Sequence, residues 1–220
     1  MSLTYVFFDL DGTLTDPAEG ITKSVAHALT FFGTEFGTLS DLKCFIGPPL
    51  MESFMQYYGY EKEKAKLAVE KYREYFKEKG IYENLLYDHV EELLQELKNR
   101  NHKIVLATSK PTVFAERILA HFEIKPYFDF IAGSNLDNTR TDKAEVIRYA
   151  LDEMKLTKEE TVIMVGDRMH DILGARKNLL RSVGVTYGYG TKEELVESGC
   201  TALAGSVREL KDLLITMLLQ

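Results

Sequence analysis

Apolar runs that alternate with helix-like segments constrain the fold of this chain more than any other feature. From about Lys103 onward, four short runs indicate strands, at 103–107, 130–133, 161–165 and 182–185. Segments with apolar residues at helical spacing lie between them. Such alternation predicts an α/β fold, a parallel sheet covered by helices. A fifth apolar run at 5–10 places a buried strand at the start of the chain.

The pattern changes between residues 16 and 84, where amphipathic helical segments, including the charged stretch 61–79, follow one another without a convincing strand. We therefore expect a core domain around the sheet, formed by residues 1–15 and 85–220, and an all-helical insertion at 16–84, attached by two linkers. Capping boxes at Thr191 and Ser206, each with Glu three positions later, predict helix starts, and the same pattern at Thr157 predicts a short turn. The apolar segment 211–220 predicts a docked helix, the alternative being a surface for a partner.

Charge and composition exclude several classes of protein. The sequence has 27 Lys and Arg against 34 Asp and Glu, a net charge of −7, which argues against a polybasic binder of nucleic acids or membrane surfaces. No segment approaches the roughly 18 apolar residues of a membrane span. The first residues lack a charged leader, and their apolar run stops at Asp9, so we expect a cytoplasmic protein. Cys44 and Cys200 lie far apart without metal-ligand spacing, which predicts reduced, unbridged thiols.

Asp9 and Asp11 follow the first predicted strand at positions i and i+2. In an extended chain their side chains point to the same side. Two carboxylates so close repel each other unless one is protonated or a cation lies between them, and Mg²⁺ prefers oxygen ligands of this kind. The alternative is that both residues only cap a loop after a strand, where acidic residues are common.

A second acidic pair, Asp167 and Asp171, follows the predicted strand 161–165. Because ligand sites of open α/β sheets form at the carboxyl ends of the strands, Asp9, Asp11 and Asp167 are expected to converge. A helix starting near Met169 would place Asp171 in its first turn. There it either caps the helix or anchors Asp167 or a metal-bound water.

Two further residues lie at expected starts of helices. Thr108 follows the predicted strand 103–107, and Pro111 is placed to be the first residue of a helix, an arrangement that binds phosphate but is also that of an ordinary turn. Lys143 follows Asp142 at the start of a predicted helix, where a cation opposes the helix dipole. This unfavourable position suggests that Lys143 reaches a phosphate or a carboxylate, the alternative being a solvated lysine.

Taken in chain order, these motifs resemble those of the haloacid dehalogenase superfamily of aspartate-nucleophile phosphotransferases. Asp9-x-Asp11-Gly12-Thr13 is similar to its first motif, Thr108 to its second, Lys143 to its third, and Gly166-Asp167-x-x-x-Asp171 to its fourth. Here Ala144 stands where proline often follows the lysine, and proline there only presets the helix start. The resemblance implies a Rossmann-like (HAD-like) core with a helical cap.

The resemblance also implies a role for each motif residue. Asp9 would be the nucleophile and Asp11 the general acid and base. Mg²⁺ would be held by the Asp9 carboxylate, the Asp11 backbone carbonyl and Asp167, with Asp171 behind them. Thr108 and Lys143 would hold the transferring phosphoryl group. The remaining phosphate- or substrate-binding positions would be Gly12, Ser109 and Gly47.

Four segments are similar to the phosphoglycolate phosphatase and 5′-nucleotidase-like branch: residues 11–21, 45–50, 107–111 and 133–137. The implied substrate is a small phosphorylated metabolite, a nucleotide or a phosphoglycolate-like ester, and the implied state a monomer or homodimer. Whether Lys23 or Lys43 in the insertion, or His170 in the fourth motif, contacts the substrate stays open. Three alternatives remain: a phosphosugar mutase of the same superfamily, a phosphorylation-dependent signalling module, and a catalytically silent binding protein.

Overall fold

The computed structural model describes residues 4–137, 139–158 and 160–218. The chain divides into two compact units, one comprising Met1–Asp16 and Leu86–Gln220 and the other Pro17–Leu85. The first unit carries the predicted catalytic motifs. A role of the second unit as a cap stays a prediction.

The first unit is built on a six-stranded parallel sheet with strand order β5-β4-β1-β6-β7-β8. At its centre, Phe7 of β1 is aligned with Val105 of β4 on one side and Met164 of β6 on the other. Every residue of β1 is buried, as in a strand covered on both faces. The predicted α/β class is confirmed, and each predicted strand is present. The strands are β1 Thr4–Phe8, β4 Lys103–Pro111, β5 Phe130–Ser134, β6 Thr161–Gly166, β7 Arg181–Val185 and β8 Ala202–Ala204.

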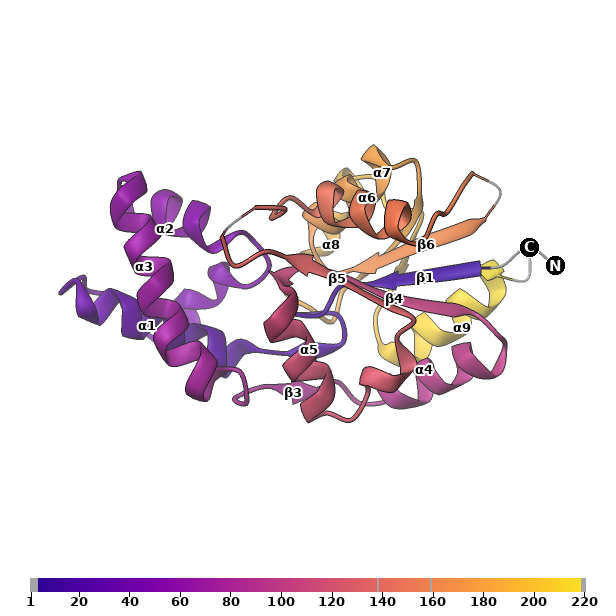
Figure 1. Ribbon diagram of the computed structural model, residues 1–220, viewed down its shortest axis with the longest axis horizontal. Coiled ribbons are helices and arrows are strands. Elements are labelled where there is room, and N and C mark those ends of the chain that lie inside the picture. The colour runs from indigo at the N-terminus through magenta and orange to yellow at the C-terminus, as the bar shows by residue number, and fades with distance from the viewer. Residues whose placement is uncertain (1–3, 138, 159, 219–220) are drawn as a thin grey trace. The chain divides into compact units, whose positions relative to one another are not determined.

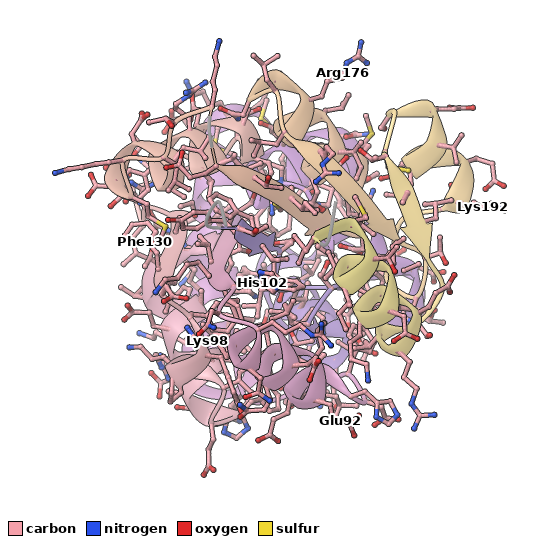
Figure 2. All side chains as sticks on the ribbon, turned by 90° about the vertical axis from the view of Figure 1, so that its right-hand side faces the viewer. Glu92, Lys98, His102, Phe130, Arg176 and Lys192 are labelled. Carbon is pink, nitrogen blue, oxygen red and sulfur yellow. The ribbon has the colours of Figure 1, made fainter. Side chains whose placement is uncertain are left out.

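Helices cover both faces of this sheet (Figure 1). Helices α6 (Lys143–Glu153) and α7 (Met169–Lys177) lie on one face, and α4 (Val90–Asn99), α5 (Thr112–His121) and α9 (Val207–Leu218) on the other. Phe7, Val105 and Met164 form one buried apolar cluster with Ile147 of α6 and Ala175 of α7. Figure 2 shows the end of the sheet where the strands begin, with His102 just before β4. The carboxyl ends of the strands, where the motifs lie, are at the opposite end.

The regular elements of the second unit are helices, except that its last residue, Leu85, belongs to a short strand. Its elements are α1 Ala18–Phe31, the 3₁₀ helix η1 Leu39–Phe45, α2 Leu50–Tyr58, α3 Lys62–Tyr75 and the π-helical turn η2 Phe76–Gly80. Phe45 and Phe54 are fully buried and their rings pack at 4.9 Å. Two-residue strands β2 (Thr15–Asp16) and β3 (Leu85–Leu86), which the sequence pattern did not predict, form a second small sheet at the two linkers.

The structure corrects the predicted start of α5. Strand β4 continues through Thr108 to Pro111, so Pro111 is the N-cap of the helix and not its first residue. Its ψ angle of 132° is extended, and the pairing of β4 with β5 shifts register between Ala107 and Pro111. The chain therefore bulges at the end of the strand instead of turning directly into a helix. Thr108 is consequently a strand residue, four positions before the first residue of α5.

The predicted capping boxes form only in part. Thr191 caps α8 (Lys192–Glu197) by accepting from Glu194 N, but the Glu194 carboxylate accepts from Arg168 and Met169 instead of closing the box. At α9 the partner carboxylate likewise bonds to the backbone N–H of Gly205. The apolar C-terminal helix is docked, with Leu210, Leu214 and Met217 buried.

Two smaller expectations concern the thiols and the membrane. Cys44 and Cys200 are both free thiols, as predicted. Across the described ranges, none of the helices combines the length and apolar character that crossing a bilayer requires.

Candidate active site

Asp9 and Asp167 lie side by side because they follow neighbouring strands. Phe8 of β1 is aligned with Val165 of β6, and Asp9 N donates to Val165 O at 2.9 Å. Both aspartates are buried, Asp167 completely. The predicted convergence of the first and fourth motifs at the carboxyl ends of the strands is therefore seen in the structure.

Lys143 is the first residue of α6, and its side chain is buried among carboxylates. Its Nζ lies 2.7 Å from Asp9 Oδ1 and 2.8 Å from Asp171 Oδ1, and donates to Ala107 O at 2.9 Å. Burial by itself would lower the pKa of Lys143, but the carboxylates of Asp171 and Asp9 outweigh this and raise it. Asp142 caps the helix by accepting from Ala144 N. The lysine that opposes the helix dipole thus has carboxylate partners.

Asp11 has a lysine of its own, which sequence reasoning did not single out. Lys110 Nζ lies 2.8 Å from Asp11 Oδ2, and both side chains are almost fully buried. Burial raises the pKa of Asp11, against the opposing effect of the Lys110 ammonium. The available signal was spacing, because Lys110 follows Thr108 by two positions and an extended chain places both on one side.

Asp9, Asp167 and Asp171 each contribute a carboxylate oxygen to a group whose atoms all lie within 4.8 Å of one another. Burial, then the neighbouring charges of Asp171 and Asp9, raise the pKa of Asp167 well above its usual range. Burial likewise raises the pKa of Asp171 to about 6, against the effect of Lys143. Three carboxylates held this close need protons or a cation between them.

The group fits a divalent cation such as Mg²⁺. Among the described residues, Asp11 Oδ1 is a buried oxygen without a hydrogen bond. Asp9 Oδ1 and Asp171 Oδ1 are also buried without a well-aligned hydrogen bond, although both are ion-paired with the Lys143 ammonium. The four site carboxylates and the two lysine ammonium groups leave two negative charges when all are ionised. A divalent ion bound by hard oxygen ligands would neutralise that charge. The Asp11 carboxylate is outside the close group, and the ligand predicted from that residue is its backbone carbonyl.

A loop after β7, Tyr187-Gly188-Tyr189-Gly190, completes the surroundings of Asp167 and was not foreseen from the sequence. Tyr189 N donates to Asp167 Oδ2 at 2.8 Å. A Cβ on Gly188 would lie 2.4 Å from Asp167 Cβ, and one on Gly190 2.0 Å from its carbonyl oxygen. Gly12 has a φ of +81°, and a Cβ added to it would lie 2.1 Å from Asp167 Oδ2. Only glycine allows the backbone to approach Asp167 this closely.

The other predicted residues are placed as follows. Thr108 is buried, and its Oγ1 accepts from Lys110 N at 3.3 Å, while Ser109 is half-buried. Asp171 contacts Lys143 and accepts from Arg168 N, so it holds the lysine as well as lying near Asp167. Roles for these residues in phosphate binding stay predictions.

Three predicted or open positions lie in the helical unit. Gly47 adopts a φ of +102°, in the turn before α2. Lys23 is paired with Glu19 at 2.6 Å and Glu83 at 2.7 Å, and Lys43 is exposed. Contact of Gly47 with substrate stays a prediction, and contact of Lys23 would require it to leave two carboxylates.

Comparison with known proteins points to one family. A family model described as haloacid dehalogenase-like hydrolase matches residues 6–185. A 5′-nucleotidase of Pseudomonas aeruginosa is 50% identical over 190 residues, 86% of this chain and 86% of that protein. Tyrosine-protein kinase PtkA of Mycobacterium tuberculosis is 36% identical over 95% of this chain and 72% of its own length. The crystal structure of a predicted phosphatase from Clostridium acetobutylicum matches with a TM-score of 0.95 and 49% identity, covering 98% of this chain and 100% of that one.

Proposed function

We propose that this chain, which belongs to the haloacid dehalogenase-like hydrolase family and is a phosphatase, hydrolyses a small phosphate monoester through an aspartyl phosphate formed on Asp9. One observation carries the proposal. Asp9 is buried at the end of β1, with the Lys143 ammonium 2.7 Å from its Oδ1 and Asp167 beside it. A carboxylate held between a cation and a candidate metal site is oriented and charge-compensated for attack on phosphorus.

The reaction has two halves. In the first, an Asp9 carboxylate oxygen attacks phosphorus, the ester P–O bond breaks, and a proton from Asp11 passes to the leaving oxygen. In the second, water attacks phosphorus, its proton returns to Asp11, and the bond to Asp9 breaks to release inorganic phosphate. Lys143 offsets the charge of Asp9 and, with Thr108, holds the phosphoryl oxygens.

The proposed cofactor is Mg²⁺, held by Asp9, the Asp11 carbonyl and Asp167 with Asp171 nearby. When bound, it supplies positive charge that lets a phosphate dianion approach a cluster of carboxylates. This chain's own contribution is to fix those carboxylates, through Tyr189 N on Asp167 and Lys143 on Asp9.

The proposed substrate is a nucleoside 5′-monophosphate, with phosphoglycolate as the second choice. Support comes from the Pseudomonas aeruginosa relative, which is named a 5′-nucleotidase and shares half of its aligned residues with this chain. A phosphoglycolate phosphatase of Colwellia psychrerythraea is 28% identical over 88% of this chain.

The test is release of inorganic phosphate from nucleoside monophosphates, phosphoglycolate, sugar phosphates and p-nitrophenyl phosphate, with Mg²⁺ and with EDTA. We expect metal-dependent turnover that Asp9→Asn lowers at least about a thousandfold, because the nucleophile is lost. The matched control is Asp152→Asn, the same change at an exposed position on α6, which should leave turnover unchanged. Substantial turnover by Asp9→Asn would overturn the nucleophile assignment.

The kinase relative makes phosphoryl transfer to tyrosine a specific alternative. Incubation with γ-labelled ATP distinguishes the two chemistries, because hydroxylamine cleaves an acyl phosphate on aspartate but not a phosphotyrosine ester. Label that resists hydroxylamine, without phosphate release from any ester, would favour the kinase. A long-lived, hydroxylamine-sensitive label, without phosphate release from any ester, would favour the mutase or the signalling module.

A further inference from the structure

The end of β4 brings a second lysine into the buried site. In the bulge between Ala107 and Pro111, Thr108 and Lys110 are buried while Ser109 between them is half-buried. Thr108 Oγ1 accepts from Lys110 N at 3.3 Å, which ties the two residues together locally. The end of the strand therefore holds Lys110 in a buried position, unlike a flexible lysine on the surface.

The two lysines of the site serve different carboxylates. Lys143 contacts Asp9 and Asp171, whereas Lys110 contacts Asp11 through Oδ2 at 2.8 Å. The Asp11 side chain is 12% exposed and that of Lys110 6%, so this is a buried ion pair and not a screened surface pair. The other carboxylate oxygen, Asp11 Oδ1, is buried and accepts no hydrogen bond from any described residue.

We propose that Lys110 is the positioning residue of Asp11, an inference that rests on the acid and base role of Asp11 in the proposed function. By holding Oδ2, the ammonium fixes the rotation of the carboxyl group and leaves Oδ1 as the atom that gives and takes the proton. When Asp11 protonates the leaving oxygen, it becomes a carboxylate opposite an ammonium that is already in place. Because the Lys110 ammonium lies 2.8 Å from Asp11 Oδ2, it stabilises the charge that appears on Asp11 as the proton leaves.

This role predicts a dependence on the leaving group that a phosphate-binding lysine would not show. A nucleoside alkoxide is a poor leaving group and needs the proton of Asp11, whereas p-nitrophenolate departs readily as the anion. Because kcat/KM reports the steps up to cleavage of the ester bond, its ratio for the two substrates isolates proton donation. A residue that binds the transferring phosphate would change both values alike.

The experiment compares wild type, Lys110→Met and Lys110→Arg on a nucleoside 5′-monophosphate and on p-nitrophenyl phosphate. We expect Lys110→Met to lower kcat/KM for the nucleotide at least about tenfold more than for p-nitrophenyl phosphate, with KM for the latter within about twofold of wild type. Lys110→Arg, which keeps the charge, should recover part of the difference. The control is Lys192→Met, an exposed lysine on α8 labelled in Figure 2, which should change neither value.

A double-mutant cycle with Asp11→Asn tests whether Lys110 acts through Asp11. In that background Lys110→Met should have almost no further effect, because residues that act as a unit are not additive. Equal losses on both substrates with a raised KM, or full additivity with Asp11→Asn, would overturn the inference and assign Lys110 to phosphate binding. If Lys110→Met does not fold by circular dichroism, the comparison is made with Lys110→Gln, which also removes the charge, and an unchanged ratio in that folded variant overturns the inference.

The outcomes separate this inference from the function on which it rests. A wild-type protein without Asp9-dependent phosphate release would overturn the proposed function, and this inference with it. An active wild type whose selectivity between leaving groups survives Lys110→Met would overturn only the role of Lys110.

Discussion

Lys143 shows how a single residue decides the charge balance of the site. It is the first residue of its helix, it is 5% exposed, and its ammonium lies within 2.8 Å of two carboxylates. Removing one member of a buried ion pair leaves the other charge uncompensated in a poorly solvated place. We therefore expect the lysine to support the stability of the fold, in addition to its proposed role in the approach of a phosphate.

We expect Lys143→Met to lower the free energy of unfolding by about 3–5 kcal/mol, because Asp9 and Asp171 would lose their shared cation. Urea denaturation followed by circular dichroism, in EDTA at pH 7.5, measures this. Lys177→Met is the matched control, since Lys177 is exposed and its contact with Asp142 at 3.6 Å is worth at most about 1 kcal/mol. Equal urea midpoints for Lys143→Met and wild type would show that the buried pair adds no stability.

At the scale of elements, the loop after β7 is held against Asp167 by glycines. The Cβ of an alanine at 190 would lie 2.0 Å from the Asp167 carbonyl oxygen, a backbone atom that cannot move aside without shifting β6. We expect Gly190→Ala to lower the free energy of unfolding by about 1–3 kcal/mol through overpacking, and to weaken Mg²⁺ binding by displacing Asp167. Urea denaturation and a Mg²⁺ titration of phosphatase activity measure the two effects.

Gly205→Ala is the control for that prediction. Its Cβ would lie 3.2 Å from the end of the Glu209 side chain and 3.8 Å from Thr186 Oγ1, an ordinary van der Waals contact, and its φ lies outside the left-handed region. The change in stability should stay within about 0.5 kcal/mol. A Gly190→Ala protein with an unchanged urea midpoint and metal affinity would mean that the loop does not support Asp167.

The elements also show which parts of the structure the sequence could predict. The central strands could be predicted because a strand that is buried on both faces is a continuous run of apolar residues in the sequence. The meeting of Asp9 with Asp167 was also predictable, since parallel strands end at one edge. Lys110 was missed although its two-residue spacing from Thr108 was a signal, because that signal applies only if the strand continues past Ala107. Tyr189 was missed because its contact with Asp167 depends on the path of a loop, which leaves no periodic signal. The three-residue strand β8 is too short to show a period.

For the whole molecule, we expect the buried carboxylates to link stability and pH with the binding of the proposed metal ion. Asp171 has its pKa raised from 3.8 to about 6, and those of Asp11 and Asp167 are raised as well. Between pH 3.8 and about 6, Asp171 is more protonated in the folded protein than in the unfolded chain. The stability that comes from this extra proton binding is therefore lost as pH rises through about 6. A divalent cation that binds the ionised carboxylates should offset that loss.

We therefore expect Mg²⁺ to raise the melting temperature clearly at pH 7.5 and much less at pH 5, where protons already occupy the site and compete with the metal. The measurement is the difference in melting temperature between samples with Mg²⁺ and with EDTA at each pH. This difference cancels the effect of groups that titrate elsewhere in the protein. One such group is Asp129, whose pKa is lowered by its lysines despite burial. Asp167→Asn is the control and should abolish the difference at both pH values, since it removes a proposed ligand. Equal stabilisation by Mg²⁺ at both pH values would place the bound ion away from the buried carboxylates, and would contradict the metal site on which the proposed chemistry depends.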